Sequence, residues 1–414
     1  MKYRSTGGDT AGRTFEEIVL EGAAPDGGLY LPESLPELSG PGPAGSHHDH
    51  VVAALEAFGA TEVDDLVAEA LSRFHHPDIA PISQVGPYLV LELFWGPTLS
   101  FKDHALQILG RLVDRYLEAR DETRTVLVAT SGDTGSAAIE GFRGRDAIDI
   151  GVLFPDGMVS EFQRRQMTTV SDSNVTVLAV QGSFDDCQRM VKEAFLSHHR
   201  LAAANSINWG RIAAQVGYHL SAAARVDGQV DVVIPTGNFG NAYSAWTARA
   251  LGASIGSITV ATNANKVLYD LHVGGAVSES AVTPTLAPAM DIQIPSNLER
   301  FLHNRGQQSF EEEFEAGWAT DEEILATIRA VFDRHGVIID PHTAVAWKVA
   351  ESLPSDTGSQ RLLVSTAHPA KFAETIENAI GIRPEVPVWG DVEEGTEESH
   401  EVIPPTLEAL ERYL

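Results

Sequence analysis

The sequence predicts an α/β fold in which mostly parallel sheets are covered by helices on both faces. From Tyr88 onward, short β-branched runs alternate with segments of helical apolar periodicity. Three of these runs begin at residues 125, 149 and 175, a spacing of about 25 residues that βαβ crossovers produce. The length of 414 residues predicts two or three domains, at roughly 150 residues per domain.

The composition is that of a soluble globular protein, with 43% hydrophobic and 21% charged residues. The single cysteine, Cys187, excludes an intrachain disulfide and any CxxC motif. The apolar runs fall short of the ~18 residues of a membrane span. The opening MKYRSTGGDT lacks the apolar core of a signal peptide. We therefore expect a cytoplasmic protein without a membrane partner.

The chain is strongly acidic, with a net charge of −29 from 29 basic and 58 acidic residues. Such an excess repels nucleic acid and anionic lipid, so neither is an expected partner. It fits either a saline environment that screens the self-repulsion or an ordinary acidic surface, and the composition favours neither.

Residues 1–85 are predicted to form a mixed N-terminal region. It begins with a helix at Phe15–Glu21, followed by a turn at Asp26–Gly28. The stretch Leu31–His50 is rich in Pro, Gly and Ser, which predicts a surface loop, and helical periodicity resumes over Val51–Phe74.

Seven strands are predicted in the remainder of the chain, which alternates with helices. They are Tyr88–Leu93, Thr125–Thr130, Asp149–Phe154, Val175–Val180, Val230–Ile234, Ser257–Ala261 and Arg361–Ser365. Near the C-terminus, Gly390–Glu401 is acidic and is expected to be a solvated stretch.

Two segments share a strand, a glycine-rich turn and a helix. In Val126–Glu140 the turn is SGDTG, and in Val232–Leu251 it is GNFGN. Such a turn directs free backbone N–H groups and the helix dipole at one point, which favours an anion such as phosphate or carboxylate. Neither turn fits GxGxxG or the GK[ST] of a P-loop. Two such turns together indicate a small ligand with two anionic groups.

Lys102 lies in the segment GPTLSFKDH, just before a helical apolar pattern. Ser100 and Asp103 fit the capping box [ST]-x-x-[DE], which predicts a helix start at this point. The helix dipole and an apolar wall would both lower the pKa of the lysine, as a Schiff-base lysine requires. A surface lysine with an extended stem is the alternative interpretation.

Two polar clusters are less informative. The tract His47–His50 has the composition of a metal-binding segment, but a solvated loop is the favoured interpretation, and no metal site is predicted. The segment Asn205–Arg211 precedes a helix and is either another anion contact or a capped helix start.

Taken together, these segments resemble the threonine synthase family of pyridoxal-phosphate enzymes. The family segments appear in order as LELFWGPTLSFKDHALQ, ATSGDTGSAA, NSINWGRIAAQ, IPTGNFGNAYSAW and STAHPAKF. The openings YRSTGG and DGGLYLPE resemble its N-terminal region, which related dehydratases lack. The resemblance covers nearly the whole chain. Gly7 departs from it, because the family pattern leads us to expect an arginine there.

The resemblance implies pyridoxal 5'-phosphate as the cofactor and the fold type II of the tryptophan-synthase β chain. Lys102 would hold the cofactor covalently, Thr366 would bond its pyridine nitrogen, and Asp133 would lie near its ring hydroxyl. Relatives often carry asparagine in place of Asp133. The cofactor phosphate would bind to the turn made of Gly237, Asn238, Phe239, Gly240 and Asn241.

The implied substrate is O-phospho-L-homoserine, converted with water to L-threonine and phosphate by β,γ-replacement. Its carboxylate would bind to the turn that begins Thr130–Ser131. Its phosphate would bind to Asn205, Ser206 and Arg211, together with Thr134. The alternatives are another lyase of this fold, such as a threonine or serine dehydratase, and a catalytically silent relative that binds phosphorylated ligands.

The resemblance also implies a domain plan. Residues 1–85 would form the N-terminal region and residues 86–414 the catalytic region. Within the latter, a lobe of about residues 103–225 would close on the substrate against a larger lobe of about 226–414. We expect a monomer or a homodimer.

Overall fold

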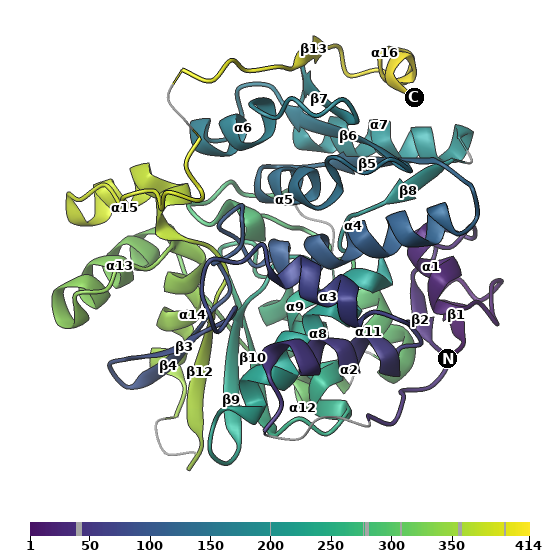
Figure 1. The fold of residues 1–414 in the computed structure, drawn as a ribbon. Helices are drawn as coiled ribbons and strands as arrows, with labels where there is room; N and C mark the ends of the chain where they lie inside the picture. The colour runs from purple at the N-terminus through teal and green to yellow at the C-terminus, as the bar shows by residue number, and fades with distance from the viewer. Residues whose placement is uncertain are drawn as a thin grey trace.

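The computed structural model contains two sheets rich in parallel strands (Figure 1). It describes residues 1–38, 44–198, 200–275, 277, 281–306, 309–354, 358–392 and 395–414. One sheet has six strands in the order β11-β10-β9-β12-β4-β3, and the other has five in the order β13-β7-β6-β5-β8. Within both, only β3 and β4 pair antiparallel. The predicted α/β fold is therefore confirmed.

All seven predicted strands are present, and their ends differ from the prediction by at most two residues. We call the part built on the six-stranded sheet the larger lobe and the part built on the five-stranded sheet the smaller lobe. The larger sheet consists of β3 (Ile82–Val85), β4 (Tyr88–Glu92), β9 (Val230–Pro235), β10 (Ile255–Thr262), β11 (Glu315–Trp318) and β12 (Gln360–Ser365). The smaller sheet consists of β5 (Arg124–Ala129), β6 (Ile148–Pro155), β7 (Val175–Val180), β8 (Leu201–Ala203) and β13 (Glu401–Ile403).

Helices cover both sheets, as expected for parallel strands joined by crossovers. Those of the first half are α1 (Phe15–Glu21), α2 (His47–Ala57), α3 (Asp64–Leu71), α4 (Lys102–Glu118), α5 (Asp133–Phe142), α6 (Glu161–Thr168) and α7 (Phe184–Ser197). Those of the second half are α8 (Trp209–Ala224), α9 (Gly240–Ala250), α10 (Val267–His272), α11 (Leu298–Arg305), α12 (Phe310–Glu313), α13 (Asp321–His335), α14 (Pro341–Ser352), α15 (Ala373–Ile380) and α16 (Leu407–Leu410). Short 3-10 helices lie at η1 (Pro288–Met290), η3 (Pro369–Phe372) and η4 (Glu411–Tyr413). None of the helices in the described ranges is long and apolar enough to cross a membrane.

The N-terminal region packs against the side of the molecule, where α2 lies on α8 and α1 contacts α4 and β8 (Figure 1). Its strands β1 (Tyr3–Ser5) and β2 (Tyr30–Pro32) form a separate antiparallel pair. Buried aromatic rings join this region to the rest, since the Tyr3 ring meets the edge of Trp209 at a centroid distance of 6.0 Å.

The predicted loop Leu31–His50 is wrong at both ends, because strand β2 runs to Pro32 and α2 already begins at His47. Ser46 caps this helix and forms a reciprocal capping box with Asp49, whose carboxylate accepts the Ser46 N–H at 2.8 Å. The histidine tract is therefore helical and not a solvated loop, and His50 is buried. Residues 39–43 of the predicted loop lie outside the described residues.

The C-terminal segment returns from the larger lobe to the smaller one, where β13 pairs with β7 (yellow in Figure 1). The range 226–414 assigned to the larger lobe is therefore divided between the two sheets. The acidic stretch before β13 is also not simply solvated in its described part. Glu398 pairs with Arg164 and accepts a hydrogen bond from the Thr168 hydroxyl at 2.6 Å.

Helices α4 and α5 cross in close backbone contact at two glycines. A Cβ added to Gly110 would lie 1.9 Å from the carbonyl oxygen of Gly141. A Cβ added to Gly141 would lie 2.4 Å from the carbonyl oxygen of Leu106. Lys102 opens α4 and Asp133 opens α5, so this crossing sets the position of one relative to the other.

Gly110→Ala is therefore expected to destabilise the protein by about 1–3 kcal/mol, because the two helix backbones must separate to admit a methyl group. Thermal unfolding followed by circular dichroism measures this loss. Glu118→Ala, at the exposed end of the same helix, is the control and should leave the unfolding midpoint nearly unchanged. Equal midpoints for the two variants would contradict the close crossing.

Candidate active site

One pocket between the lobes is lined by all fourteen residues predicted for the site. They are Lys102, Thr130, Ser131, Asp133, Thr134, Asn205, Ser206, Arg211, Gly237, Asn238, Phe239, Gly240, Asn241 and Thr366. The residues come from segments that follow the carboxyl ends of β5, β8, β9 and β12, and from the start of α4. In open α/β sheets, this is the edge at which ligands bind.

Lys102 is the first residue of α4 and is only 9% exposed. The predicted capping box is wrong, because the helix starts one residue too late for Ser100 to be its N-cap. The Ser100 hydroxyl has no partner among the described residues. The Asp103 carboxylate instead accepts hydrogen bonds from the Thr98 N–H at 2.9 Å and the Thr98 hydroxyl at 2.7 Å.

Burial lowers the pKa of Lys102, as predicted, because a buried ammonium has lost its hydration. The carboxylate of Asp133, 3.3 Å from Nζ, opposes this effect. The positive charges of Lys371 and Arg211 add to it. Lys102 is therefore more easily deprotonated than a surface lysine, which a nucleophilic or basic amine requires.

The turn after β5 is built around the Thr130 side chain. The Thr130 hydroxyl accepts hydrogen bonds from the N–H groups of Gly132, at 2.9 Å, and Gly135, at 3.0 Å. Gly132 has φ +143°, and a Cβ there would lie 2.5 Å from the amide of Gln163. The backbone conformation at residue 132 therefore requires glycine. The hydrogen bonds that the Thr130 hydroxyl accepts lie within the turn.

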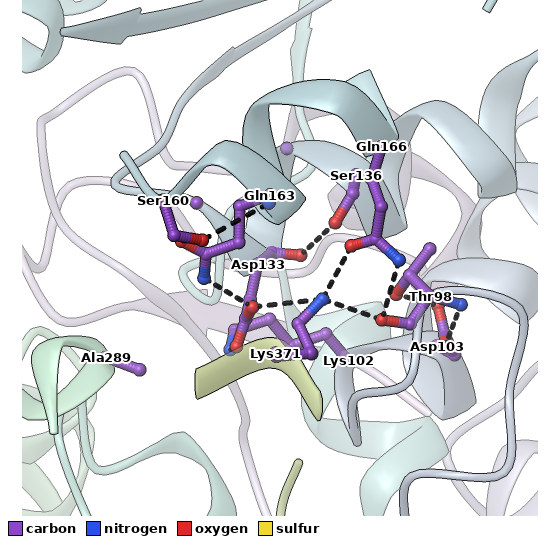
Figure 2. Close-up of polar contacts among 12 residues, drawn as sticks. Thr98, Lys102, Asp103, Asp133, Ser136, Ser160, Gln163, Gln166, Ala289 and Lys371 are labelled. Atoms are coloured by element: carbon purple, nitrogen blue, oxygen red, sulfur yellow. Dashed lines mark hydrogen bonds and ion pairs between the residues drawn. The ribbon is translucent and has the colours of Figure 1, made fainter. Parts of the chain in front are cut away.

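Asp133, at the start of α5, lies among three donors (Figure 2). Lys102 lies 3.3 Å from its Oδ2, while Lys371 at 3.2 Å and the Gln163 amide at 2.8 Å contact its Oδ1. Burial alone would raise the pKa of Asp133, but the two lysines hold it well below its usual value. Asp133 is therefore ionised and acts only as an acceptor.

The turn after β9 leads into α9, whose first residue is Gly240. The first N–H groups of a helix have no acceptor inside it, so they are available to an anion. Phe239 lies in the left-handed region at φ +63° and closes the turn. A Cβ on Gly237 would lie 2.6 Å from the Ala289 carbonyl oxygen, so the turn and the neighbouring loop touch through their backbones.

Asn241 in this turn has a fixed orientation. Its Oδ1 accepts from the Tyr218 hydroxyl at 2.9 Å and lies 2.8 Å from Nε2 of His219. Its Nδ2 is buried and lacks a partner among the described residues. A buried donor without an acceptor calls for one from a ligand, so this turn fits the phosphate of pyridoxal phosphate.

Arg300 supports the same turn indirectly, through Asn297, and was not predicted from the sequence. It is fully buried, donates from Nε to the Tyr30 carbonyl at 2.7 Å, and also bonds the Ile207 carbonyl and the Asn297 side chain. Asn297 in turn donates to the Asn238 carbonyl at 3.1 Å. Arg300 thus connects the N-terminal region to the turn after β9 and to the segment Asn205–Arg211.

Arg211 is a buried cation that has no counter-charge among the described residues. It is 2% exposed, and burial lowers its pKa to about 10. One Nη donates to the Ala204 carbonyl at 2.9 Å, but Nε has no partner and no carboxylate pairs with it among the described residues. Asn205 beside it has a buried, unpartnered Oδ1. A buried charge of this kind is costly unless an anionic ligand completes the site.

Thr366 follows β12 and lines the pocket, with 6% of its surface exposed. It presents a hydroxyl, and its own carbonyl accepts the Phe101 N–H at 2.8 Å. Ser131 and Thr134, in the turn after β5, are the more exposed of the predicted residues there.

Sequence reasoning missed several side chains that line or support the pocket. They are Gln163, Phe184, Gln188, Gln215, Met290, His342, Lys371 and Phe372. His342 has both ring nitrogens engaged, by Asp340 at 2.8 Å and the Ala289 N–H at 3.2 Å. Lys371 and Phe372 had a signal, since both lie in the motif STAHPAKF, and Lys371 is also one of six lysines.

The described residues contain no group of three or more His, Cys, Asp and Glu arranged to hold a metal ion. Among the described residues, the lysine, arginine and carboxylate side chains that line the pocket are Lys102, Arg211 and Asp133, and Lys371 contacts Asp133 from outside the pocket lining. In a chain with a net charge of −29, this local excess of positive charge suits an anionic ligand.

Comparison with known proteins gives a consistent result over the whole chain. Residues 74–365 match the family described as pyridoxal-phosphate dependent enzyme, residues 2–44 match the threonine synthase N terminus, and residues 343–414 match its C-terminal family.

Individual relatives agree with these matches. The chain is 38% identical to a threonine synthase of Pseudomonas aeruginosa, over 100% of this chain and 98% of that protein. It is 35% identical to the Schizosaccharomyces pombe threonine synthase, over 92% and 89%. The crystal structure of threonine synthase from Brucella melitensis with bound pyridoxal phosphate superposes with a TM-score of 0.92 at 39% identity, over 100% and 98%. The chain belongs to the threonine synthase family of pyridoxal-phosphate-dependent enzymes.

Proposed function

We propose that this enzyme converts O-phospho-L-homoserine and water to L-threonine and phosphate, the reaction for which its family is named. One observation carries the proposal. A buried lysine of lowered pKa lies in a pocket with two separate groups that suit an anion, the helix start at Gly240 and the guanidinium of Arg211. A pyridoxal-phosphate enzyme that acts on a phosphorylated amino acid needs both sites.

Three parts of the pocket would hold the cofactor. The turn Gly237–Asn241 would bind its phosphate through backbone N–H groups and the Asn241 amide. Thr366 would bond its pyridine nitrogen, and Lys102 would attach to its carbonyl carbon. When bound, pyridoxal phosphate supplies an electron sink that stabilises negative charge on the substrate carbons next to the amino group.

The substrate would lie across the smaller lobe. The turn that begins with Thr130 and Ser131 would hold its carboxylate. Asn205, Ser206 and Arg211, together with Thr134, would hold its phosphate. A guanidinium suits this second task because its planar fork can donate two bonds to one phosphate. Arg211 would also neutralise charge on the phosphate as its bond to the γ-carbon breaks.

Lys102 would move the protons of the reaction once its amine is free. It would take a proton from the α-carbon, pass that proton on, and then, neutral again, take one from the β-carbon. Its lowered pKa favours the neutral form that each removal requires. Phosphate then leaves from the γ-carbon, which takes up a proton to become the methyl group of threonine. The elements of water add at the β-carbon, and the α-carbon regains a proton. Burial of the site keeps other water away from these steps.

We propose that the protein acts in the cytoplasm, as a monomer or homodimer, and that the lobe of about residues 103–225 closes on the substrate. X-ray scattering with and without a non-reacting substrate analogue tests the closure, and identical profiles would contradict it.

The function itself is tested by supplying O-phospho-L-homoserine to the protein loaded with pyridoxal phosphate. Threonine and free phosphate should appear in equal amounts. Phosphate with a keto acid and ammonia in place of threonine would identify a lyase of the same fold. Tight binding without any product would identify a silent phospholigand-binding protein.

A further inference from the structure

Lys371 reaches from the larger lobe into the polar contacts around Asp133 (Figure 2). It lies in η3, and its side chain is completely buried. Its Nζ contacts the Thr98 carbonyl at 2.7 Å, the Gln166 Oε1 at 2.7 Å and Asp133 Oδ1 at 3.2 Å. An ammonium has three N–H donors, and here each has an acceptor, so Lys371 is held as a cation.

The two oxygens of Asp133 have different partners. Oδ1 is occupied by Lys371 and by the Gln163 amide, and neither group changes during the proposed reaction. Oδ2 faces Lys102, whose amine is consumed when it forms a covalent bond to the cofactor. At that point Lys102 no longer supplies the same ammonium partner, whereas Lys371 still does.

The other charged or titratable groups near this pair do not replace Lys371. Arg211 acts on Lys102, and the more distant His342 has both ring nitrogens engaged. Asp103 lies on the other side of Thr98 and is itself acidic, so it adds no positive charge. Lys371 is thus the cation on which Asp133 depends.

We propose that Lys371 is a positioning residue that keeps Asp133 ionised, with Oδ2 presented to Lys102, whether or not Lys102 carries a charge. The inference rests on the proposed function, because the cofactor is the group that engages Lys102. An ionised carboxylate accepts and does not donate, so Asp133 stabilises a proton on the cofactor or on the attached nitrogen of Lys102. Asparagine at the same position would lack this charge.

The first test uses the cofactor-free protein and compares the thermal unfolding of Lys371→Met, Asp133→Asn and the double variant. Lys371→Met leaves the buried carboxylate of Asp133 without the charge of Lys371 and should lower the unfolding midpoint by about 5 °C or more. Adding Asp133→Asn removes that carboxylate and should recover part of the loss. Lys348→Met is the control, because its ion pair with Glu323 is exposed and contributes little. A double variant no more stable than Lys371→Met, or one that does not fold, overturns the proposal.

The second test follows the absorbance of bound pyridoxal phosphate as a function of pH. In Lys371→Met the buried carboxylate takes up a proton itself, so the midpoint of the cofactor titration should fall by about one pH unit or more. Loss of the lysine charge acting directly on the cofactor would instead raise the midpoint. A raised or unchanged midpoint therefore overturns the proposal, as does a further fall on adding Lys371→Met to Asp133→Asn.

These outcomes separate the inference from the function on which it rests. A cofactor-loaded protein that makes a keto acid refutes the proposed function, and both tests of Lys371 can still be read. A protein that takes up no pyridoxal phosphate also refutes the proposed function, and the thermal comparison then decides whether Lys371 acts through Asp133.

Discussion

Lys102→Ala is expected to lower kcat for threonine formation by at least about 1000-fold, because the amine is both the attachment point of the cofactor and the base in the proposed reaction. The fold should survive, since Asp133 keeps Lys371 and Gln163 as partners when Lys102 is removed. The measurement is the joint release of threonine and phosphate from O-phospho-L-homoserine.

The control for this variant is Lys348→Ala, which removes a partly exposed lysine of α14 that does not line the pocket. It should retain the activity of the unmodified protein. Retention of substantial activity by Lys102→Ala would mean that another amine holds the cofactor, and the assignment of this lysine would be abandoned.

Arg211→Met is expected to lower kcat/KM for O-phospho-L-homoserine by about 100-fold or more, mainly through KM. The variant removes the buried cation that would pair with the substrate phosphate. In the substrate-free protein the same change should raise the unfolding midpoint, because an unpaired buried charge is replaced by an apolar side chain of similar length.

In Arg211→Met, kcat/KM is thus expected to fall while the unfolding midpoint rises. Activity assays give kcat and KM, and calorimetry of the ligand-free protein gives the midpoint. Arg334→Met, at a largely exposed position of α13, should change neither. If Arg211→Met lost stability as well as activity, the guanidinium would have a structural partner, and its assignment to the substrate phosphate would fail.

The sequence predicted the main strands and both turns because these depend on local signals. A β-branched run followed by a glycine-rich turn specifies its own geometry, as at Gly132 and Gly237. The pocket also followed from topology, since turns after parallel strands gather at one edge of the sheets. For that reason residues as distant as Lys102 and Thr366 could be assigned to one site.

What could not be predicted is the choice between competing local hydrogen bonds, the exact ends of elements, and contacts between distant segments. The capping box at Ser100 failed because Asp103 bonds to Thr98 instead. The helix start at His47 was overlooked because the preceding stretch rich in Pro, Gly and Ser was extended too far. Lys371 carried no sign of its partner, since Asp133 lies more than two hundred residues earlier in the chain.

The pairing of β13 with β7 has a consequence for the behaviour of the protein in solution. A sheet that ends in an uncovered strand offers a row of free N–H and C=O groups to other chains, and this favours aggregation. The three residues Glu401–Ile403 cover that border of the five-stranded sheet. Strand β13 thus protects the solubility of the protein, and its removal by a protease would leave β7 as an edge strand open to self-association.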